Sequence, residues 1–378
     1  MAAVFAGSYL VLLFARLLLA WCGAIRAKKH ELPIAPVPVS ILQPILSGDP
    51  MLEATLADNV RSLPNAHFLW LVDIDDRAAQ STTERLKEAY PQTKVRVILC
   101  PPVPAATNPK VFKLALAERL VETPHLVVLD DDTRLPAKTL LALQSALSSS
   151  FLATGLPVYR RGGGVPSRLV EQFVNNESLL TYLSWSALST PLTLNGMIYA
   201  LRTEDWLARG GFAPLQRHLT DDVAVARAVL NAGHRLHQSA QIVEVATTVR
   251  DSTHHRSLMH RWFLFAGLLF SLQPQPKRAL LTVFLALPSV LLWALFISLT
   301  LAPTREAGVL VLITLVLRSL SLGTLHYLLS DRWRHHPVYS ILAELAQPFH
   351  ALHARVKRTL LWRGRRIRVR DEAHFDFL

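Results

Sequence analysis

Cysteine is scarce in this chain: Cys22 and Cys100 are the only two among 378 residues. Neither belongs to a Cys-x-x-Cys pair or to a metal-ligand spacing, which excludes a disulfide framework and a cysteine zinc site. We expect both to be ordinary thiols in a reducing compartment.

Charge is also scarce, and one sign is favoured. Only 18% of the residues are charged, 51% are hydrophobic, and 28 acidic residues face 40 Lys and Arg residues. A net charge of +12 on an apolar chain favours a membrane protein whose soluble surface meets anionic headgroups or phosphorylated substrates. Nucleic acid is the rival partner, but the basic residues lie beside hydrophobic segments and no recognition motif is present, so we expect no nucleic acid.

The signatures of several enzyme classes are missing as well. The sequence has no internal repeat, no P-loop, no Gly-x-Gly-x-x-Gly turn that opens a helix and no Ser-His-Asp pattern. Its length could hold two average domains or one domain with membrane segments, and the composition favours the second.

Three long apolar segments predict membrane-spanning helices: residues 2–25, 279–302 and 308–329. The first is apolar except for Arg16 and a few small polar groups, and basic residues follow it. A cleaved signal peptide is the alternative, but its positive charges should precede the apolar run. The placement of Lys and Arg around all three segments predicts an outside N-terminus and a cytoplasmic soluble domain.

Two weaker segments suit the membrane surface. Residues 257–272 are apolar but carry His260, Arg261 and Trp262, which favours the interface over a span. Residues 338–352 predict an interfacial or re-entrant helix, and the basic residues that follow predict a solvated tail on anionic lipid.

Residues 39–249 alternate strand and helix signals, which predicts βαβ units, an α/β fold and a mostly parallel sheet. The expected strands are residues 39–42, 67–72, 95–99, 126–130 and 155–159. The expected helices are residues 51–63, 77–90, 110–121 and 137–148.

One stretch carries the strongest chemical signal, because the apolar residues 126–129 run directly into Asp130, Asp131 and Asp132. A buried parallel strand would present Asp130 and Asp132 at its carboxyl end, where open α/β sheets bind ligands. Two carboxylates at this spacing repel each other unless a cation lies between them, which favours Mg²⁺ or Mn²⁺ carrying a diphosphate. A polar loop with solvated aspartates is the alternative.

Two further groups of carboxylates lie at the ends of predicted elements. Asp73 ends a strand and can accept hydrogen bonds from a nucleotide base or ribose, whereas Asp75 and Asp76 suit a turn. Asp221 and Asp222 open an amphipathic helix, where they either complement the helix dipole or supply a general base.

Arg261 and Trp262 are the fourth element. Arg suits bidentate binding of a diphosphate, and Trp can wall a sugar or anchor at the headgroups. The neighbouring His254, His255 and His260 lack the ligand geometry of a zinc site and suit phosphate or interface contacts. Together these elements fit an inverting glycosyl transfer, in which a metal and an Arg stabilise the leaving diphosphate and a carboxylate deprotonates the attacking hydroxyl.

The order of these residues resembles that of the inverting family 2 type glycosyltransferases with a GT-A fold. The chain is most similar to the ceramide glucosyltransferase branch, which includes bacterial hopanoid-associated members. The resemblance covers about residues 5–370 and includes several shorter strings: Val39-Ser-Ile-Leu-Gln-Pro44, Gly48-Asp-Pro50, Asn108-Pro-Lys110, Gly155-Leu-Pro157, Asn195-Gly-Met197 and Trp362-Arg-Gly-Arg-Arg366.

The resemblance implies a role for each of these side chains and a set of domains. The implied roles are uridine binding for Asp73; donor binding for Lys110, Asp130, Arg261 and Trp262; metal binding for Asp130 and Asp132; catalytic base for Asp222; and secondary or acceptor contacts for Asp221 and His260. The implied domains are a transmembrane helix over residues 1–30, a GT-A domain over 31–256, an interfacial helix over 257–276, a transmembrane hairpin over 277–330 and an interfacial helix with a basic tail over 331–378.

The chain departs from the family pattern at four positions. Leu258 replaces a Gln or Arg, Gln43 a Lys, Asp131 a small residue and Asp221 a Glu. The contact missing at Leu258 is either lost or supplied by His260. These departures bear on the sugar and the acceptor more than on the reaction.

We therefore predict a multi-pass membrane enzyme that transfers a hexose or N-acetylhexosamine from a UDP-sugar to the hydroxyl of a lipid such as ceramide or a hopanoid. A processive polysaccharide synthase and an inactive membrane scaffold are the alternatives. Three spans are few for a polymer channel, and the intact acidic groups argue against the scaffold. The bacterial inner membrane is the expected location.

Overall fold

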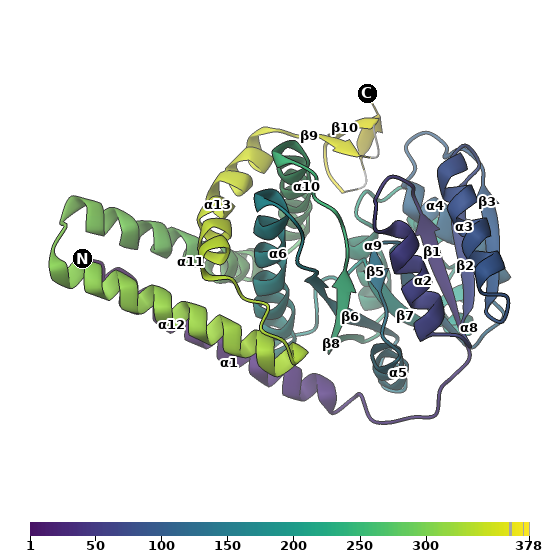
Figure 1. Cartoon of the computed structure of the whole chain (residues 1–378), viewed down its shortest axis with the longest axis horizontal. Helices are drawn as coiled ribbons and strands as arrows, with labels where there is room; N and C mark the ends of the chain where they lie inside the picture. The colour runs from purple at the N-terminus through teal and green to yellow at the C-terminus, as the bar shows by residue number, and fades with distance from the viewer. Residues whose placement is uncertain (363–364, 373, 378) are drawn as a thin grey trace. The chain divides into compact units, whose positions relative to one another are not determined.

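The computed structural model describes residues 1–362, 365–372 and 374–377 and divides into two compact units. The helical unit consists of Met1–Gly23, Arg161–Ser189 and Val249–Arg366, and the sheet unit consists of Ala24–Arg160, Thr190–Thr248 and Ile367–Leu378. Each unit is therefore assembled from segments that lie far apart in the sequence, as the colours of Figure 1 show.

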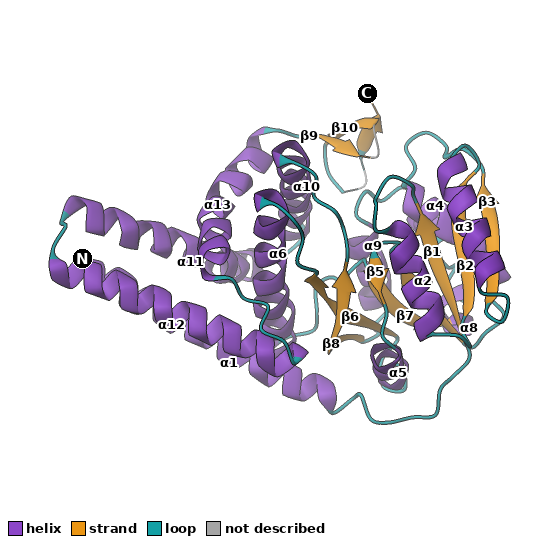
Figure 2. Cartoon of the chain, viewed as in Figure 1, coloured by secondary structure: helices purple, strands orange, loops and turns teal. Residues whose placement is uncertain are grey.

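The sheet unit is built on eight strands in the order β3-β2-β1-β4-β7-β6-β8-β5 (Figure 2). Its strands are β1 (Val39–Ile45), β2 (His67–Asp73), β3 (Lys94–Cys100), β4 (His125–Leu129), β5 (Thr133–Arg134), β6 (Leu152–Tyr159), β7 (Ile198–Arg202) and β8 (Leu236–Val245). The neighbours β3, β2, β1 and β4 run parallel, as do β6 and β8, whereas β7 and β5 are antiparallel to their neighbours. This architecture confirms the predicted α/β fold with a mostly parallel sheet.

Helices cover both faces of this sheet, which explains why every residue of its central strands β1 and β4 is buried. The helices of the unit are α2 (Leu52–Ser62), α3 (Arg77–Ala89), α4 (Pro109–Ala117), α5 (Ala137–Ala146), α8 (Thr203–Leu207) and α9 (Asp221–Asn231), with short 3-10 turns η1 (Glu118–Leu120) and η3 (Ala213–Leu215). Ile41 and Val127 point into the core with α2, α3 and α5, and Leu42 and Val128 point into the core with α4, α8 and α9. Successive residues of one strand thus face opposite cores.

The predicted elements of residues 39–159 all occur, with ends that differ by a few residues. The structure adds β5, β7 and β8, which the sequence did not predict. These strands carry the sheet past β4, so β4 is an interior strand and not an edge strand.

The helical unit contains the membrane-spanning candidates. Its elements are α1 (Ala2–Lys28), α6 (Val165–Glu177), the π-helical η2 (Ser178–Leu183), α7 (Ser184–Leu188), α10 (Ser252–Ser271), α11 (Gln275–Leu301), α12 (Arg305–Ser330), α13 (Pro337–Val356) and β9 (Thr359–Trp362). Three of them, α1, α11 and α12, have 26 or 27 residues and are long and apolar enough to cross a membrane. Each measures about 40 Å, which exceeds the hydrocarbon thickness of a bilayer. These helices support membrane association, as predicted.

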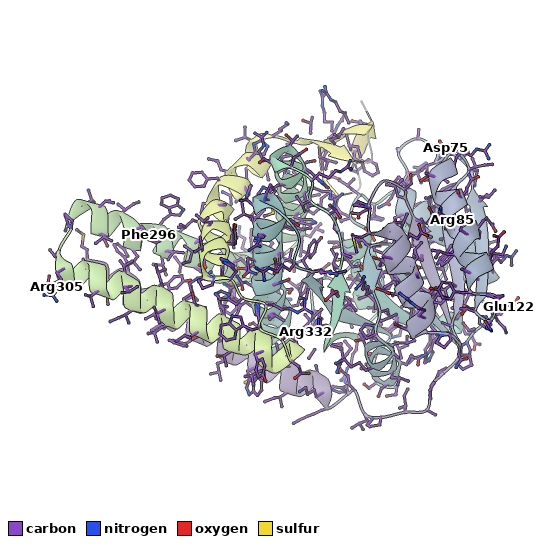
Figure 3. The ribbon with its side chains drawn as sticks, viewed as in Figure 1. Asp75, Arg85, Glu122, Phe296, Arg305 and Arg332 are labelled. Atoms are coloured by element: carbon purple, nitrogen blue, oxygen red, sulfur yellow. The ribbon has the colours of Figure 1, made fainter. Side chains whose placement is uncertain are left out.

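Two local features concern the ends of α12 and the packing of α1. Arg305 begins α12 and Arg332 is the second residue after its end, so the two charges flank the apolar stretch at its opposite ends (Figure 3). Gly23 of α1 lies against the carbonyl oxygen of Leu183, where a Cβ atom would overlap that oxygen. Only glycine permits this close approach between α1 and η2. The predicted interfacial helix over residues 338–352 corresponds to α13, and its contact with a membrane stays a prediction.

The C-terminal residues contain a hairpin that the sequence did not predict. β10 (Arg365–Val369) pairs antiparallel with β11 (Phe375–Phe377). Ile367 and Val369 are buried, whereas Arg368 between them is exposed. The alternation of a strand thus supplies an apolar face that a count of charges hides, and the contact of the basic side chains with anionic lipid stays a prediction. Arg363 and Gly364 of the family-like string lie outside the described residues.

Candidate active site

Asp130 and Asp132 follow β4, whose five residues are all buried. The chain turns immediately after the strand, because the Thr133 amide donates to the Asp130 carbonyl over 3.1 Å. The carboxylate of Asp132 accepts hydrogen bonds from the hydroxyls of Thr133, at 3.1 Å, and Thr247. Burial and then the negative charge of Asp130 raise the pKa of Asp132 to about 6. The two carboxylates therefore repel each other.

Asn108 organises two parts of the site. Its side-chain oxygen caps α4 by accepting hydrogen bonds from the amides of Lys110 (3.0 Å) and Val111 (3.3 Å). Its side-chain nitrogen donates to the carbonyls of His218 (3.0 Å) and Leu219 (3.1 Å) in the loop that leads to α9. One amide group thus fixes both the helix that carries Lys110 and the loop before α9.

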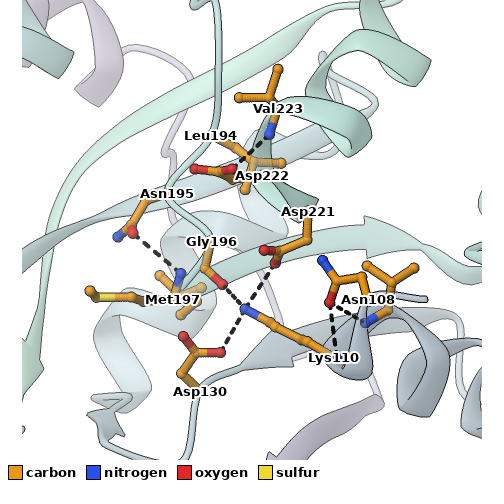
Figure 4. Close-up of polar contacts among 12 residues, drawn as sticks. Asn108, Lys110, Asp130, Leu194, Asn195, Gly196, Met197, Asp221, Asp222 and Val223 are labelled. Carbon is orange, nitrogen blue, oxygen red and sulfur yellow. Dashed lines mark hydrogen bonds and ion pairs between the residues drawn. The ribbon is translucent and has the colours of Figure 1, made fainter. Parts of the chain in front are cut away.

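Lys110 joins three segments of the sheet unit (Figure 4). Its ammonium contacts Asp130 Oδ1 (2.7 Å), Asp221 Oδ2 (3.1 Å) and the carbonyl oxygen of Gly196 (2.6 Å). Burial alone would lower the pKa of Lys110, but the two carboxylates raise it above its usual value, so the lysine stays charged. This charge holds together the end of β4, the loop before β7 and the start of α9.

Asp222 differs from its neighbour Asp221 although both lie in the first turn of α9. The carboxylate of Asp222 points away from Lys110 (Figure 4) and accepts a hydrogen bond from the Val223 amide at 2.9 Å. It forms no ion pair with any residue in the described part of the chain. Burial and then the charge of Asp221 raise the pKa of Asp222 to about 7. A carboxylate with these properties is suited to accept a proton near neutral pH.

The loop before α9 is also held by the β10–β11 hairpin of the same unit. The Leu219 amide donates to the Glu372 carbonyl over 3.0 Å, and the buried Glu372 carboxylate contacts His218 Nδ1 (2.8 Å) and Arg227 (3.7 Å). Glu372 was missed because its segment was assigned to the lipid surface. The sequence feature that could have pointed to Glu372 is the acidic pair Asp371 and Glu372 within a basic segment.

Asp73 lies at the end of β2 and pairs with a lysine that the sequence prediction missed. Lys113 Nζ lies 2.8 Å from Asp73 Oδ2, and its side chain is 0% exposed. Its spacing of three residues from Lys110 in an apolar helix was the available signal, because residues three apart share a helix face. Asp76 belongs to the turn that was predicted for it and caps α3 by accepting from the Ala79 amide over 3.0 Å.

Two departures from the family pattern have structural partners. Gln43 accepts a hydrogen bond from Trp70 Nε1 (3.0 Å) and donates to the carbonyl of Asp130 (3.2 Å), so it links β1 to both neighbouring strands. Asp131 accepts from the Leu46 amide (2.7 Å) and so fixes the loop after β1. Both residues support the backbone beside Asp130.

Arg261 and Trp262 lie on α10 of the helical unit. Trp262 stacks on Phe173 of α6, with ring centroids 6.2 Å apart. His260 Nε2 lies 3.1 Å from the carbonyl oxygen of Thr359. These are contacts within the helical unit, and the binding of diphosphate or acceptor by Arg261, Trp262 and His260 stays a prediction.

The donor set at β4 fits a divalent cation that is shared with a ligand. No three His, Cys, Asp or Glu side chains of the described residues cluster closely enough to hold a metal by themselves. Burial and then the charge of Asp130 raise the pKa of Asp132, and a cation bound by the two carboxylates would relieve their repulsion. Mg²⁺ and Mn²⁺ are commonly held by one or two carboxylates together with substrate phosphates.

The family comparison decides the class to which this site belongs. The model described as Glycosyl transferase family 21 matches residues 4–375. The chain belongs to glycosyltransferase family 21. This assignment and the α/β fold confirm the predicted class, a GT-A-type glycosyltransferase.

Solved structures include similar chains. The mannosyltransferase PcManGT from Pyrobaculum calidifontis, in complex with GDP-Man and Mn²⁺, is 17% identical, with 94% of this chain and 98% of that chain covered and a TM-score of 0.51. S. aureus TarS 1–349 in complex with UDP-GlcNAc is 12% identical, with 90% and 99% covered and a TM-score of 0.37. Glucosyl-3-phosphoglycerate synthase from Mycobacterium tuberculosis, with Mn²⁺ and UDP-glucose, is 15% identical, with 64% and 83% covered and a TM-score of 0.37. Of these three, the first supports a shared fold with this family 21 chain.

Proposed function

We propose that this protein transfers a hexose or N-acetylhexosamine from a UDP-sugar to the hydroxyl of a membrane lipid of the ceramide or hopanoid type, with inversion at the sugar carbon. The observation that carries the proposal is the contrast within one helical turn: Asp221 is paired with Lys110, whereas Asp222 is unpaired among the described side chains and has a raised pKa. An enzyme that activates an alcohol needs such a base.

The other side chains of the sheet unit bind and orient the donor in this proposal. Asp73, held by Lys113, accepts hydrogen bonds from the uridine. Asp130 and Asp132 hold Mg²⁺ or Mn²⁺, which when bound neutralises charge on the diphosphate. Lys110 keeps the Asp130 and Asp221 carboxylates in place, so that the base at Asp222 is not drawn into an ion pair of its own. The solved mannosyltransferase complex with GDP-Man and Mn²⁺ supports a nucleotide sugar and a divalent metal for this fold.

The lipid acceptor is supported by the three apolar helices and by the interfacial composition of α10. Arg261 and Trp262 contact the diphosphate and the acceptor in this proposal, and His260 supplies a secondary contact. The distribution of Lys and Arg favours an outside N-terminus and a cytoplasmic sheet unit. The compact, Arg- and Ala-rich chain favours the bacterial inner membrane as the location.

The decisive variant is Asp222→Asn, which keeps the size of the side chain and removes the base. We expect UDP-sugar binding with Mn²⁺, measured by calorimetry, to remain and transfer to fall by about 10³-fold. Asp205→Asn, in the first turn of α8, is the matched control and should retain activity. Full turnover by Asp222→Asn would refute the assignment of the base.

The product identifies the acceptor and separates the alternatives. Lipids from cells that express the protein with a panel of UDP-sugars should contain one new glycolipid by mass spectrometry. A ladder of sugar units would instead support a processive synthase. Absence of both product and metal-dependent donor hydrolysis would support an inactive scaffold.

A further inference from the structure

The helical unit holds a group of charged side chains that the proposed transfer does not use. Arg16 of α1 pairs with Glu177 of α6 (2.7 Å), and Arg318 of α12 pairs with Glu344 of α13 (2.6 Å). Charged groups within membrane-spanning helices are costly, and they therefore mark binding sites or pathways by default.

Both pairs line one narrow cavity of about 10 Å³. This volume accommodates one group of the size of a water molecule. Phe173, Leu180 and Pro288 line the same cavity. Both polar and apolar side chains therefore surround it.

Three atoms of the cavity's residues have no hydrogen-bond partner in the described part of the chain: Arg16 Nε, Arg318 Nη1 and Asn176 Oδ1. These residues are 3%, 1% and 6% exposed, so bulk solvent does not satisfy the three atoms. The amide nitrogen of Asn176 is engaged with Ser340 Oγ at 2.7 Å, which leaves its oxygen for another donor. The residues that line the cavity thus carry two N–H donors and one acceptor without a partner among the described residues.

We propose that this cavity binds the hydroxyl group of an uncharged membrane amphiphile. A hydroxyl accepts two hydrogen bonds and donates one, which matches the two arginine donors and the asparagine oxygen. The cavity has no net charge, because two arginines face two glutamates, and it therefore does not call for an anionic headgroup. The bound alcohol is either the acceptor of the proposed transfer or a neutral lipid of the bilayer, and binding itself does not depend on that transfer.

The first test compares two probes on the unmodified full-length protein in lipid nanodiscs. A long-chain primary alcohol with a photoactivatable group in its tail should label peptides of α1, α6, α12 or α13. Its methyl ether keeps the tail but cannot donate, and should label these peptides about tenfold less. Equal labelling by alcohol and ether would overturn the proposal, and no variant is needed for that result.

The second test uses Arg16→Lys and Arg318→Lys. Lysine keeps the charge that each glutamate requires but removes the planar fork and its free nitrogen. Labelling by the alcohol should fall by about fivefold or more in each variant. Arg305→Lys, exposed at the start of α12, is the matched control and should label like the unmodified protein. Unchanged labelling in both Lys variants would contradict the site.

Competition without any sugar donor then identifies the source of the alcohol. Excess unlabelled N-acyl amino alcohol should displace the probe if the cavity takes the acceptor, and excess diacylglycerol should displace it if the cavity takes a bilayer lipid. Displacement of the probe by either compound supports the site. If neither compound displaces the probe, the proposal is overturned.

Discussion

At the scale of single residues, the carboxylates of the candidate site differ in whether they contact a lysine. Asp73, Asp130 and Asp221 each contact a buried lysine, whereas Asp222 does not. The helix dipole, which was the alternative explanation for two aspartates in one helical turn, would act on both alike. Their different surroundings instead suit different tasks: Asp221 fixes the start of α9, and Asp222 is the base in the proposed transfer.

Transfer should lose rate as the pH falls through the raised pKa of Asp222. Burial and Asp221 raise that pKa to about 7, so below neutral pH the base is increasingly protonated and cannot accept a proton. We expect kcat/KM to fall about tenfold per pH unit below about pH 6, whereas an ordinary aspartate would keep the rate level to about pH 5. The measurement is a pH-rate profile with donor binding followed in parallel.

Asp221→Asn provides the control for this assignment. It removes the negative charge that helps to raise the pKa of Asp222, so the acid limb of the profile should move to lower pH. A limb that stays in place, or a profile that is level to about pH 5 in the unmodified enzyme, would contradict the role of Asp222.

Lys113 should contribute to both stability and donor binding. Lys113→Met leaves the Asp73 carboxylate without its partner, and we expect a loss of about 2–4 kcal/mol in the free energy of unfolding. Chemical denaturation in detergent measures this loss, and the KM for the UDP-sugar should rise in the same variant. The double variant with Asp73→Asn should lose less than the sum of the two single losses, because the two groups are in contact. Additive losses would show that the pair is not coupled.

At the scale of elements, the sequence predicted those whose pattern is local. The apolar run of β4 that ends in aspartates and the Asn-Pro cap of α4 are visible without any partner. β8 could not be predicted in this way, because Gln238 and Ser239 interrupt its apolar pattern although both are buried. The side-chain nitrogen of Gln238 donates to the carbonyl of Gly155 (3.2 Å) on β6, and this bond exists only after the sheet has formed.

The candidate site divides in the same way. Asp130, Asp132 and Asp222 could be predicted because each lies next to the end of an element that the sequence indicates. Lys113 and Glu372 could not be assigned, because their partners are 40 and at least 145 residues away in the chain. Their roles arise only from tertiary structure.

The β10–β11 hairpin should matter for catalysis through the loop before α9. Glu372→Ala removes the contacts with His218 and Arg227, so the loop that leads to Asp222 becomes less constrained. We expect kcat to fall by about tenfold with little change in the donor KM, because a small misplacement of a reacting group costs rate before binding. The control is Asp376→Ala on the same hairpin. Among the described residues, the Asp376 side chain pairs only with the exposed Arg370. Full activity after deletion of residues 367–378 would contradict this positioning role.

At the scale of the whole molecule, the two compact units do not follow the order of the chain. The segment Arg161–Ser189 lies between β6 and β7 in sequence but belongs to the helical unit. Its α6 is tied there by Asn176 to Ser340 (2.7 Å) and by Gln172 to the His336 amide (2.9 Å). The domain predicted over residues 31–256 would therefore contain α6 without those partners, and its independence stays a prediction.

A fragment of residues 31–256 tests this arrangement. In the fragment α6 loses the α13 side chains that cover it, so Val170, Val174 and Leu180 would form an exposed apolar patch. We expect this fragment to aggregate, and a second fragment with residues 162–188 replaced by a flexible Gly-Ser linker to be more soluble while keeping its α/β circular dichroism. Size-exclusion chromatography measures the difference, and both fragments lack the β10–β11 hairpin, so they are matched in that respect. A monodisperse, folded fragment 31–256 would show that α6 does not need the helical unit, and the sheet unit with its insertion would then be an independent domain.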